Sequence, residues 1–263
     1  MKLCLDVGNS HIYGGVYESD RALLTFRKTS KTGASSDEYG LFFRSVLREN
    51  KLDPDLVSSV ALCSVVPEVV YTISGACQKY FNTAPFILQA GVKTGLKIQY
   101  RNPLEVGTDR IANAIAGVDR FPGENLVIVD LGTATTLCII GKDRSYRGGI
   151  ILPGLKMSMQ ALESGTSKLR SVEITRKKVC LGRTTAESIQ SGLYFGHLGA
   201  LREIMQRVRL EEFGTEQVRV IATGGFASLF DDTDLFDHVI PDLVLHGLLA
   251  ALRLNAVTPA SPS

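Results

Sequence analysis

The chain contains one short pattern twice, once at its start and once near its middle. Asp6-Val7-Gly8-Asn9-Ser10 follows the apolar run Leu3-Cys4-Leu5, and Asp130-Leu131-Gly132-Thr133-Ala134-Thr135-Thr136 follows Leu126-Val127-Ile128-Val129. Each copy is a strand of buried type that ends in Asp-x-Gly with small polar residues. A carboxylate at a strand end can hold a hydrated cation, and the glycine lets the backbone approach a phosphate. A single Asp-x-Gly is also common in plain hairpin turns, but two copies predict a duplicated phosphate clamp that holds a nucleotide.

The order of predicted elements is similar in the two halves. The first half predicts strands over 2–7, 12–18 and 23–29, a helix over 37–50, a strand over 57–64, a helix over 67–80 and a strand over 86–89. A loop-rich connector over 91–108 leads into a buried helix over 110–118. The second half predicts strands over 126–130, 134–141 and 145–151, helices over 155–162 and 184–208, a strand over 218–222, a helix over 242–255 and a frayed tail from Thr258. This repetition predicts a duplicated α/β architecture with domains over residues 1–117 and 118–263.

Composition argues against several other classes of protein. Hydrophobic residues make up 44% and charged residues 21% of the chain, which is typical of a globular protein with a sizeable core. The net charge of +2 comes from mixed signs, and the basic run 176–178 is too short to predict nucleic-acid binding. No apolar stretch reaches the roughly 18 to 20 residues of a membrane helix. The start of the chain reads as a strand that contains Asp6, so we expect no signal peptide and no membrane partner.

The cysteines and histidines do not form a recognisable metal or disulfide pattern. The five cysteines have unrelated spacings without C-x-x-C, which is typical of buried thiols in a reducing cytoplasm. The four histidines are scattered along the chain, so the sequence does not predict a zinc site. We therefore expect a cytoplasmic protein.

Two common nucleotide-binding motifs are absent. The chain has no G-x-x-x-x-G-K-[ST] and no G-x-G-x-x-G opening a helix, which disfavours a P-loop kinase and a dinucleotide-binding fold. The duplicated arrangement instead resembles the ribonuclease-H-like fold of the actin, sugar-kinase and heat-shock-chaperone ATPase superfamily. This resemblance implies two α/β halves with ATP bound in a cleft between them.

Within that superfamily, an ordered set of motifs resembles the type III pantothenate kinases along nearly the whole chain. The motifs that carry this resemblance begin with the first clamp and continue with Ser64-Val65-Val66-Pro67, Asn102-Pro103, Val106-Gly107-Thr108-Asp109-Arg110, the second clamp, Gly148-Gly149-Ile150-Ile151-Leu152-Pro153-Gly154, Gly182-Arg183-Thr184-Thr185, Ala222-Thr223-Gly224-Gly225 and Pro241-Asp242-Leu243-Val244-Leu245-His246-Gly247-Leu248. The resemblance implies ATP-dependent phosphorylation of pantothenate to 4′-phosphopantothenate, the first step toward coenzyme A.

The resemblance also implies how the first clamp binds ATP. Asp6 would bind a magnesium ion directly or through water, and the expected phosphate-binding residues are Asp6, Val7, Gly8, Asn9, Ser10, His11, Ile12 and Tyr13. The family usually has threonine at the position of Ser10, and the serine keeps the hydroxyl.

The segment Gly107-Thr108-Asp109-Arg110 is the most specific of these motifs. It lies at the start of a predicted helix, where backbone N–H groups and the helix dipole favour an anion such as the pantothenate carboxylate, and Arg110 adds a cation. The resemblance makes Asp109 the proton acceptor for the substrate hydroxyl, and it implies pantothenate contacts for Tyr100, Gly107, Thr108, Asp109, Arg110 and Thr185. Structural alternatives remain open: a helix cap for Asp109 or Thr185, and an ion pair for Arg110.

The second clamp is assigned a different cation. The resemblance implies that Thr133 contacts an ATP phosphate and that Asp130 holds a monovalent cation, K⁺ or NH₄⁺, although Asp130 could also simply cap a turn. The turn Thr223-Gly224-Gly225 would let the backbone approach adenine or ribose, and Arg147 and Gly148-Gly149 would line the cleft. The family is typically dimeric, so a homodimer is expected. A non-catalytic transcription accessory factor on the same scaffold and a kinase for another small hydroxylated substrate, such as a sugar, remain alternatives.

Overall fold

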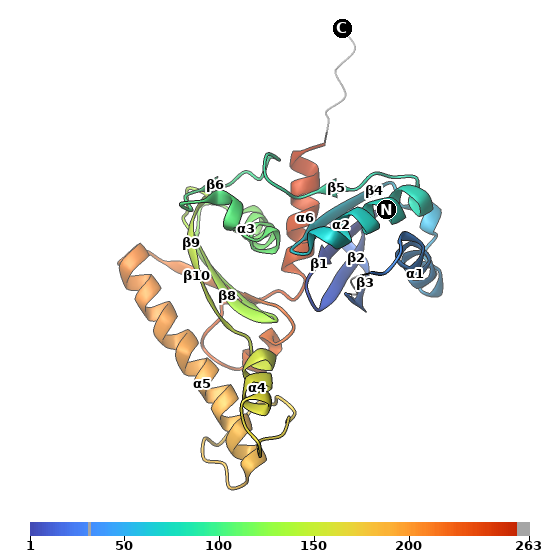
Figure 1. Cartoon of the computed structure of the whole chain (residues 1–263). Helices are drawn as coiled ribbons and strands as arrows, with labels where there is room; N and C mark the ends of the chain where they lie inside the picture. The colour runs from blue at the N-terminus through green and yellow to red at the C-terminus, as the bar shows by residue number, and fades with distance from the viewer. Residues whose placement is uncertain (31–32, 257–263) are drawn as a thin grey trace. The chain divides into compact units, whose positions relative to one another are not determined.

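The computed structural model describes residues 1–30 and 33–256, which form two compact units (Figure 1). Unit 1 consists of residues 1–96 and 100–120 together with the segment that starts at Leu243. Unit 2 consists of residues 97–99 and 121–242. The tail from Thr258 lies outside the described residues.

Unit 1 contains a five-stranded mixed sheet with the strand order β3-β2-β1-β4-β5. Its strands are β1 (Lys2–Val7), β2 (His11–Glu18), β3 (Arg21–Thr29), β4 (Ser59–Ser64) and β5 (Phe86–Ile87). β1, β2 and β3 pair antiparallel, whereas β1, β4 and β5 run parallel. The carboxyl ends of β1 and β4 therefore lie at the same edge of the sheet.

Helices pack against both faces of this sheet. Alternate residues of β1 (Leu3, Leu5 and Val7) share a core cluster with α1 (Ser36–Glu49) and α2 (Pro67–Phe81). A capping box between Ser35 and Glu38 starts α1, and Pro67 lies in the first turn of α2 as predicted. α3 (Thr108–Arg120) contacts β4, and α6 (Leu243–Leu254) contacts β1 and β4. Side chains alternate between the two faces of the sheet along β1, so α3 and α6 cover the face that carries Cys4 and Asp6.

α3 and α6 pack closely against each other (Figure 1). Every residue of α3 from Arg110 to Val118 is buried, and most of α6 is buried as well. A Cβ atom on Gly247 would lie only 1.9 Å from the carbonyl oxygen of Ala112, so this approach requires glycine at position 247. The C-terminal helix is thereby held in unit 1.

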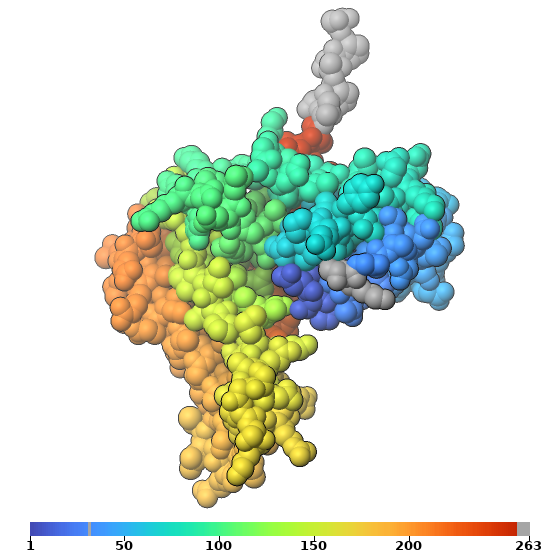
Figure 2. Space-filling model, in the orientation of Figure 1, coloured from blue at the N-terminus to red at the C-terminus, as the bar shows by residue number. Residues whose placement is uncertain are grey.

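Unit 2 contains a six-stranded mixed sheet with the order β11-β10-β7-β8-β9-β6. Its strands are β6 (Lys97–Ile98), β7 (Asn125–Leu131), β8 (Ala134–Ile140), β9 (Ser145–Pro153), β10 (Val218–Thr223) and β11 (His238–Val239). The core joins β7 and β8 to α4 (Leu155–Ser164) and α5 (Thr185–Val208). Figure 2 shows α4 and the segment after it, in yellow, beside α5, in orange; Leu169, Val172 and Ile174 of that segment pack on this core.

The two sheets share one topology. In unit 2 the order β9-β8-β7-β10-β11 corresponds to β3-β2-β1-β4-β5 in unit 1, with three antiparallel strands followed by two parallel pairings in both. The predicted duplicated ribonuclease-H-like fold is therefore confirmed. The two Asp-x-Gly clamps occupy equivalent places, because each follows the first strand of its sheet (β1 or β7).

The structure differs from the sequence prediction in short elements and in how the chain is divided. Not predicted were β6, β11, the 3₁₀-helices η1 (Pro54–Leu56), η2 (Pro103–Glu105) and η4 (Ala227–Phe230), and the π-helix η3 (Arg209–Phe213). The final helix α6 belongs to unit 1, whereas the sequence division grouped it with the second half; its packing on α3 and β1 is the reason. In the part of the chain that the structure describes, no helix is long and apolar enough to cross a membrane.

Candidate active site

Asp6 lies at the end of β1, on the face of the sheet that α3 and α6 cover. The parallel register with β4 places Asp6 beside Cys63 and Val7 beside Ser64. The Cys63 thiol donates a hydrogen bond to Asp6 Oδ1 over 3.3 Å. The Asp6 carboxylate is thus tied to the neighbouring strand, next to the loop that the sequence assigns to phosphate.

The loop between β1 and β2 offers mainly backbone groups and small polar side chains. Gly8 N donates to His11 O over 3.0 Å, and Ser30 N donates to Ser10 O over 3.0 Å, which fixes both ends of the loop. The side chains of Asn9, Ser10 and His11 are exposed. Those of Val7 and Ile12 are fully buried in the core of unit 1, so these two positions can offer only backbone atoms to a ligand.

Tyr13 follows this loop on β2. It is half-buried, and the Arg27 guanidinium stacks on its ring, with 4.3 Å between Cζ and the ring centroid.

The start of α3 is joined to the end of β4. Ser64 N donates to Thr108 Oγ1 over 3.1 Å, and Thr108 Oγ1 donates to Ser64 O over 3.0 Å. Ile111 N donates to Gly107 O over 3.1 Å and closes the first helical turn. The first residues of α3 therefore lie directly beyond the strand end that neighbours Asp6.

The negative charges of Asp6 and Asp109 both act on the buried thiol of Cys63. Burial raises the pKa of Cys63 well above its ordinary value of 9.0, and the negative charges of Asp6 and Asp109 raise it further. Asp109 Oδ1 accepts a hydrogen bond from Arg110 N over 2.8 Å. Asp6 therefore acts on Cys63 through a hydrogen bond and Asp109 acts on it through its charge, although sequence reasoning did not connect Cys63 to the site.

The neighbours of Asp109 are tightly packed. A Cβ atom on Gly107 would lie 2.5 Å from Asp109 Oδ1, so glycine leaves room for this carboxylate. Arg110 is only 9% exposed, and its Nη2 donates to Glu105 O over 3.2 Å. Tyr100 is half-buried in the same unit. The start of α3 and the buried Arg110 guanidinium together are typical of an anion-binding site.

In unit 2 the second clamp is enclosed by two glycine turns. Asp130 on β7 neighbours Thr223 on β10, and the next residue, Gly224, has φ +92°. A Cβ atom on Gly224 would lie 2.4 Å from Asp130 Oδ1, and one on Gly154 would lie 2.2 Å from Thr133 O. The loop that carries Thr133 therefore lies between the Gly154 and Gly224 turns. Sequence reasoning assigned no role to Gly154, and its place at the end of the motif 148–154 was the one signal for this contact.

Thr185 is not the cap of its helix. Thr184 is the N-cap of α5, with Glu187 completing a capping box, and Thr185 is the first helical residue, with an exposed side chain. The capping alternative for Thr185 is therefore wrong, and its hydroxyl is not used in that way.

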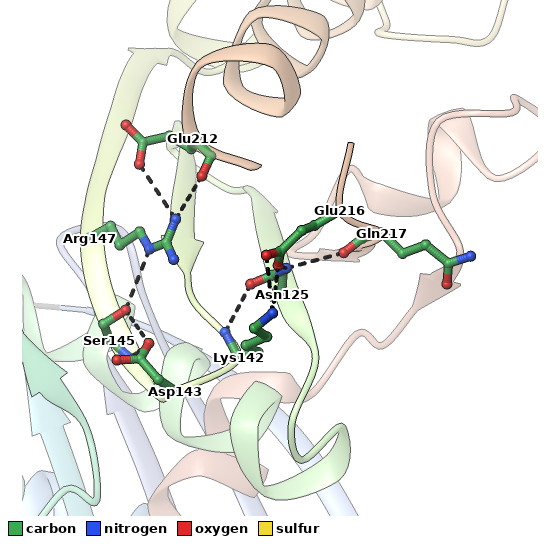
Figure 3. A network of polar contacts seen from close by, with 8 residues as sticks. All are labelled: Asn125, Lys142, Asp143, Ser145, Arg147, Glu212, Glu216 and Gln217. Carbon is green, nitrogen blue, oxygen red and sulfur yellow. Dashed lines mark hydrogen bonds and ion pairs between the residues drawn. The ribbon is translucent and has the colours of Figure 1, made fainter. Parts of the chain in front are cut away.

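Arg147, expected to line the cleft, contacts the π-helix η3 instead (Figure 3). Its Nη1 donates to Glu212 O over 2.8 Å, and its guanidinium lies 5.1 Å from the ring centroid of Phe213. Arg147 lies near the start of β9, at a register shift between β8 and β9, whereas Thr136, the cross-strand neighbour of Asp130, pairs with Ile151. Four residues of strand separate the two levels, roughly 13 Å, so Arg147 belongs to a different part of the unit.

A surface cavity of about 880 Å³ also lies in this distant part of unit 2. It is lined by the first residues of β7 and β10, Asn125 and Val218, whereas the clamp follows the last residues of these strands. Two ion pairs, Lys142–Glu216 and Arg219–Glu124, lie among its lining residues (Figure 3 shows the first pair). The cavity is therefore not the candidate active site.

The carboxylates of the two clamps can each contribute one or a few oxygen ligands to a hard cation. Residues 1–30 and 33–256 contain no group of three or more His, Cys, Asp or Glu side chains arranged to hold a metal ion. Magnesium in nucleotide enzymes commonly uses one or two carboxylates and completes its shell with phosphates and water. Single carboxylates beside a phosphate-type loop, as at Asp6 and Asp130, fit that pattern.

Solved structures share this fold at low sequence identity. A candidate 2-dehydro-3-deoxygalactonokinase from Sinorhizobium meliloti matches with a TM-score of 0.61 and 13% identity, over 100% of this chain and 99% of its own. A candidate Baf family transcriptional activator from Campylobacter jejuni matches with a TM-score of 0.58 and 18% identity, over 96% and 98%. At such identities these likenesses show the fold alone.

Sequence comparisons are more specific. The sequence model of the type III pantothenate kinase family matches residues 2–207. A type III pantothenate kinase from Legionella pneumophila (strain Paris) is 56% identical over 97% of this chain and 99% of its own length. Type III pantothenate kinase 1 from Francisella tularensis subsp. holarctica (strain OSU18) is 45% identical over 97% and 100%. Because the match extends over almost the whole chain in both relatives, the chain belongs to the type III pantothenate kinase family.

Proposed function

We propose that this chain transfers the γ-phosphoryl group of ATP to the primary hydroxyl of pantothenate and so forms 4′-phosphopantothenate, the first step toward coenzyme A. The observation that carries the proposal is the set of hydrogen bonds at the ends of β1 and β4: Cys63 donates to Asp6, and Ser64 is bonded to Thr108, the residue directly before Asp109. Family membership supports the same activity. Phosphoryl transfer depends mainly on positioning and charge stabilisation, and this arrangement offers both.

Asp109 is assigned the role of proton acceptor. The substrate hydroxyl must lose its proton as it attacks the γ-phosphorus, and a carboxylate within hydrogen-bond reach can accept that proton. The buried Arg110 and the N–H groups at the start of α3 provide positive potential for the pantothenate carboxylate. Tyr100, Gly107 and Thr108 complete the proposed pantothenate contacts in unit 1, and Thr185 is the proposed contact in unit 2.

The first clamp is assigned to ATP and its magnesium ion. Backbone N–H groups and exposed small side chains between Val7 and Tyr13 would bind phosphate oxygens, and Asp6 would hold Mg²⁺ directly or through water. Magnesium, when bound, offsets the negative charge of the phosphates. The hydrogen bond from Cys63 keeps the Asp6 carboxylate at the end of β1.

The second clamp is assigned to a phosphate and a monovalent cation. Thr133 would donate to an ATP phosphate, and Asp130 would hold K⁺ or NH₄⁺. Asp130 lies against the backbone of Gly224, so its position is sterically defined. A carboxylate of fixed position with hard oxygen donors is suited to such a cation.

The two alternative functions are less well supported. A regulator without catalysis would not need Asp6, Asp109 and Asp130, and this chain has all three. A likeness to a candidate transcriptional activator at 18% identity concerns the fold only. A different hydroxylated substrate is tested by competition of common sugars with pantothenate in a kinase assay.

The assembly and compartment follow from the family and the cysteines. We propose a homodimer, as is typical of the family, in a reducing cytoplasm, since all five cysteines are free thiols and four of them are buried. The apolar faces of α3 and α6, which offered weak sequence support for a dimer, pack on each other and on the sheet of unit 1. The dimer therefore rests on the family alone.

The test is a kinase assay with the purified chain, ATP, Mg²⁺, K⁺ and pantothenate. Wild-type protein should form 4′-phosphopantothenate, and Asp109→Asn should lower kcat by about 10²- to 10⁴-fold, the usual contribution of a general base, with an unchanged circular dichroism spectrum. Asp119→Asn, at the other end of α3, where Asp119 pairs with Arg253 at the surface, is the matched control and should keep wild-type kcat. Full activity of Asp109→Asn would remove the proton-acceptor role.

A further inference from the structure

The hydroxyl of Thr108 is occupied by the backbone of a single residue. Thr108 Oγ1 accepts from Ser64 N (3.1 Å) and donates to Ser64 O (3.0 Å). A threonine hydroxyl has one hydrogen to donate, and Ser64 O takes it. The side chain is therefore engaged inside the protein rather than presented to a ligand.

These two hydrogen bonds replace the backbone bonds that a longer β5 would make to Ser64. Leu88 N donates to Leu62 O, which is the last bond that β4 makes on the β5 side. On the other side of β4, Val65 N donates to Val7 O at the end of β1. Residues 62 and 64 of a strand direct their backbone polar groups to the same side, so Ser64 would extend the ladder beyond the end of β5. Thr108 Oγ1 satisfies both groups of Ser64 at that point.

Ser64 also connects the first clamp to α2. Its hydroxyl accepts from Val66 N (2.9 Å) and contacts Val66 O (3.0 Å) and Val7 O (3.4 Å). Val7 is the residue directly after Asp6, and Thr108 is the residue directly before Asp109. A continuous set of hydrogen bonds thus connects the phosphate-type loop, the end of β4 and the start of α3.

We propose that Thr108 is a positioning residue: its hydroxyl fastens the start of α3 to Ser64 and so holds Asp109 at a fixed distance from the first clamp. This proposal rests on the proposed function. It reassigns Thr108, for which the family resemblance implied a pantothenate contact, because the side chain is already used by Ser64. The backbone N–H of Thr108 stays available for the substrate in this assignment.

The variants follow from the geometry. Thr108→Val has nearly the same shape but cannot bond Ser64, whereas Thr108→Ser keeps the hydroxyl. Thr108→Ala is a second variant without the hydroxyl, in which water can bond the backbone of Ser64. It should show the same kinetic changes as Thr108→Val, so the test does not depend on the folding of one variant. The readouts are kcat, the KM for pantothenate and for ATP, and the Kd for pantothenate by calorimetry.

Thr108→Val and Thr108→Ala are expected to lower kcat by about 10- to 100-fold, because misplacing a reacting group by about 1 Å has a cost of that size. The KM for ATP and the Kd for pantothenate are expected to change by less than about threefold. Thr108→Ser is expected to restore kcat to within about threefold of wild type. Hydrogen exchange of the Ser64 amide, followed by NMR without substrate, should be faster in the two variants that lack the hydroxyl.

Two results would overturn the proposal. One is a raised Kd for pantothenate with unchanged kcat in Thr108→Val, which would make the hydroxyl a substrate contact. The other is unchanged amide exchange at Ser64. Failure of the proposed function is recognised separately, because wild-type protein would then form no phosphopantothenate while the exchange experiment still reports on the Thr108–Ser64 bonds.

Discussion

Gly224 has a left-handed backbone conformation directly after the strand that neighbours Asp130. Its φ of +92° is a value that residues with a Cβ atom rarely adopt, and such an atom would lie 2.4 Å from Asp130 Oδ1. A Cβ atom on Gly225, the next residue, would have nothing within 4 Å. The two glycines of the same turn therefore differ in what they can tolerate.

We predict that Gly224→Ala lowers the free energy of unfolding by about 1 to 3 kcal/mol, the usual cost of a strained backbone conformation. Because the added methyl group must displace the Asp130 carboxylate, the K⁺ concentration for half-maximal activity should rise as well. Urea unfolding and a K⁺ titration of kinase activity measure the two effects. Gly225→Ala is the control and should match wild type in both. A Gly224→Ala protein with wild-type stability and K⁺ response would contradict the assigned geometry.

Individual site residues were predictable where a motif names them and not where packing alone brings them in. Asp6, Asp109 and Asp130 stand inside recognisable patterns at strand or helix ends. Cys63 stands in no such pattern, and the motif that begins at Ser64 does not indicate its bonds to Thr108, because these contacts come from the parallel register of β4 with β1 and from the approach of α3. Both are long-range contacts that sequence spacing does not encode.

Helix α5 shows how two adjacent threonines can have separate roles. Thr184 Oγ1 accepts from Glu187 N over 3.2 Å, and Glu187 Oε2 accepts from Thr184 N over 3.2 Å and from Arg183 N over 2.7 Å. Thr185 is the first helical residue, and its side chain is exposed. Substitution of Thr184 should therefore affect stability, and substitution of Thr185 should affect substrate binding.

We predict that Thr184→Ala lowers the free energy of unfolding by about 1 kcal/mol through loss of the N-cap, without raising the KM for pantothenate. Thr185→Ala should change stability by less than about 0.5 kcal/mol, as exposed substitutions usually do, and should raise the KM for pantothenate if its proposed contact is correct. Denaturant unfolding and steady-state kinetics on both variants provide the measurements, and each variant is the control for the other. A loss of stability in Thr185→Ala alone would reverse the capping assignment.

The long elements were predicted because each has an apolar pattern of its own, whereas the short ones depend on their neighbours. Strands such as β1 and β7 have continuous apolar runs, and α5 has a regular apolar stripe with a cap at its start. β6 and β11 contain only two residues each and exist because β9 and β10 offer free edges. The π-helix η3 ends with Phe213, whose ring lies under the Arg147 guanidinium, a tertiary contact absent from any local pattern.

At the scale of the whole molecule, duplication was predictable but the path of the chain was not. The repeated clamps and strand order imply two similar sheets, and the structure has them. The return of the chain to unit 1 through α6 depends on the glycine contact between Gly247 and Ala112, which no local pattern indicates. An apolar helix at the end of a sequence does not indicate which sheet it covers.

The buried thiols of unit 1 should make the stability of the protein sensitive to alkaline pH. Burial raises the pKa of Cys4 on β1 and of Cys77 on α2 from 9.0 to about 12. In the unfolded chain each thiol loses its proton near pH 9, but in the folded protein it stays protonated. The contribution of each thiol is therefore fully present below pH 9 and is lost as the pH rises toward 12.

We predict that the free energy of unfolding falls between pH 9 and pH 11 and that Cys4→Ala reduces this slope by about 1.4 kcal/mol per pH unit, the linkage of one proton. The slope is the readout, because Cys4→Ala also leaves a cavity that lowers stability at every pH. Cys180 is exposed, so Cys180→Ala is the matched control and should leave the slope unchanged. Urea unfolding at several pH values measures all three proteins. If Cys4→Ala and wild type lose stability in parallel above pH 9, the Cys4 thiol is not held protonated by the core, and the alkaline sensitivity must come from another group.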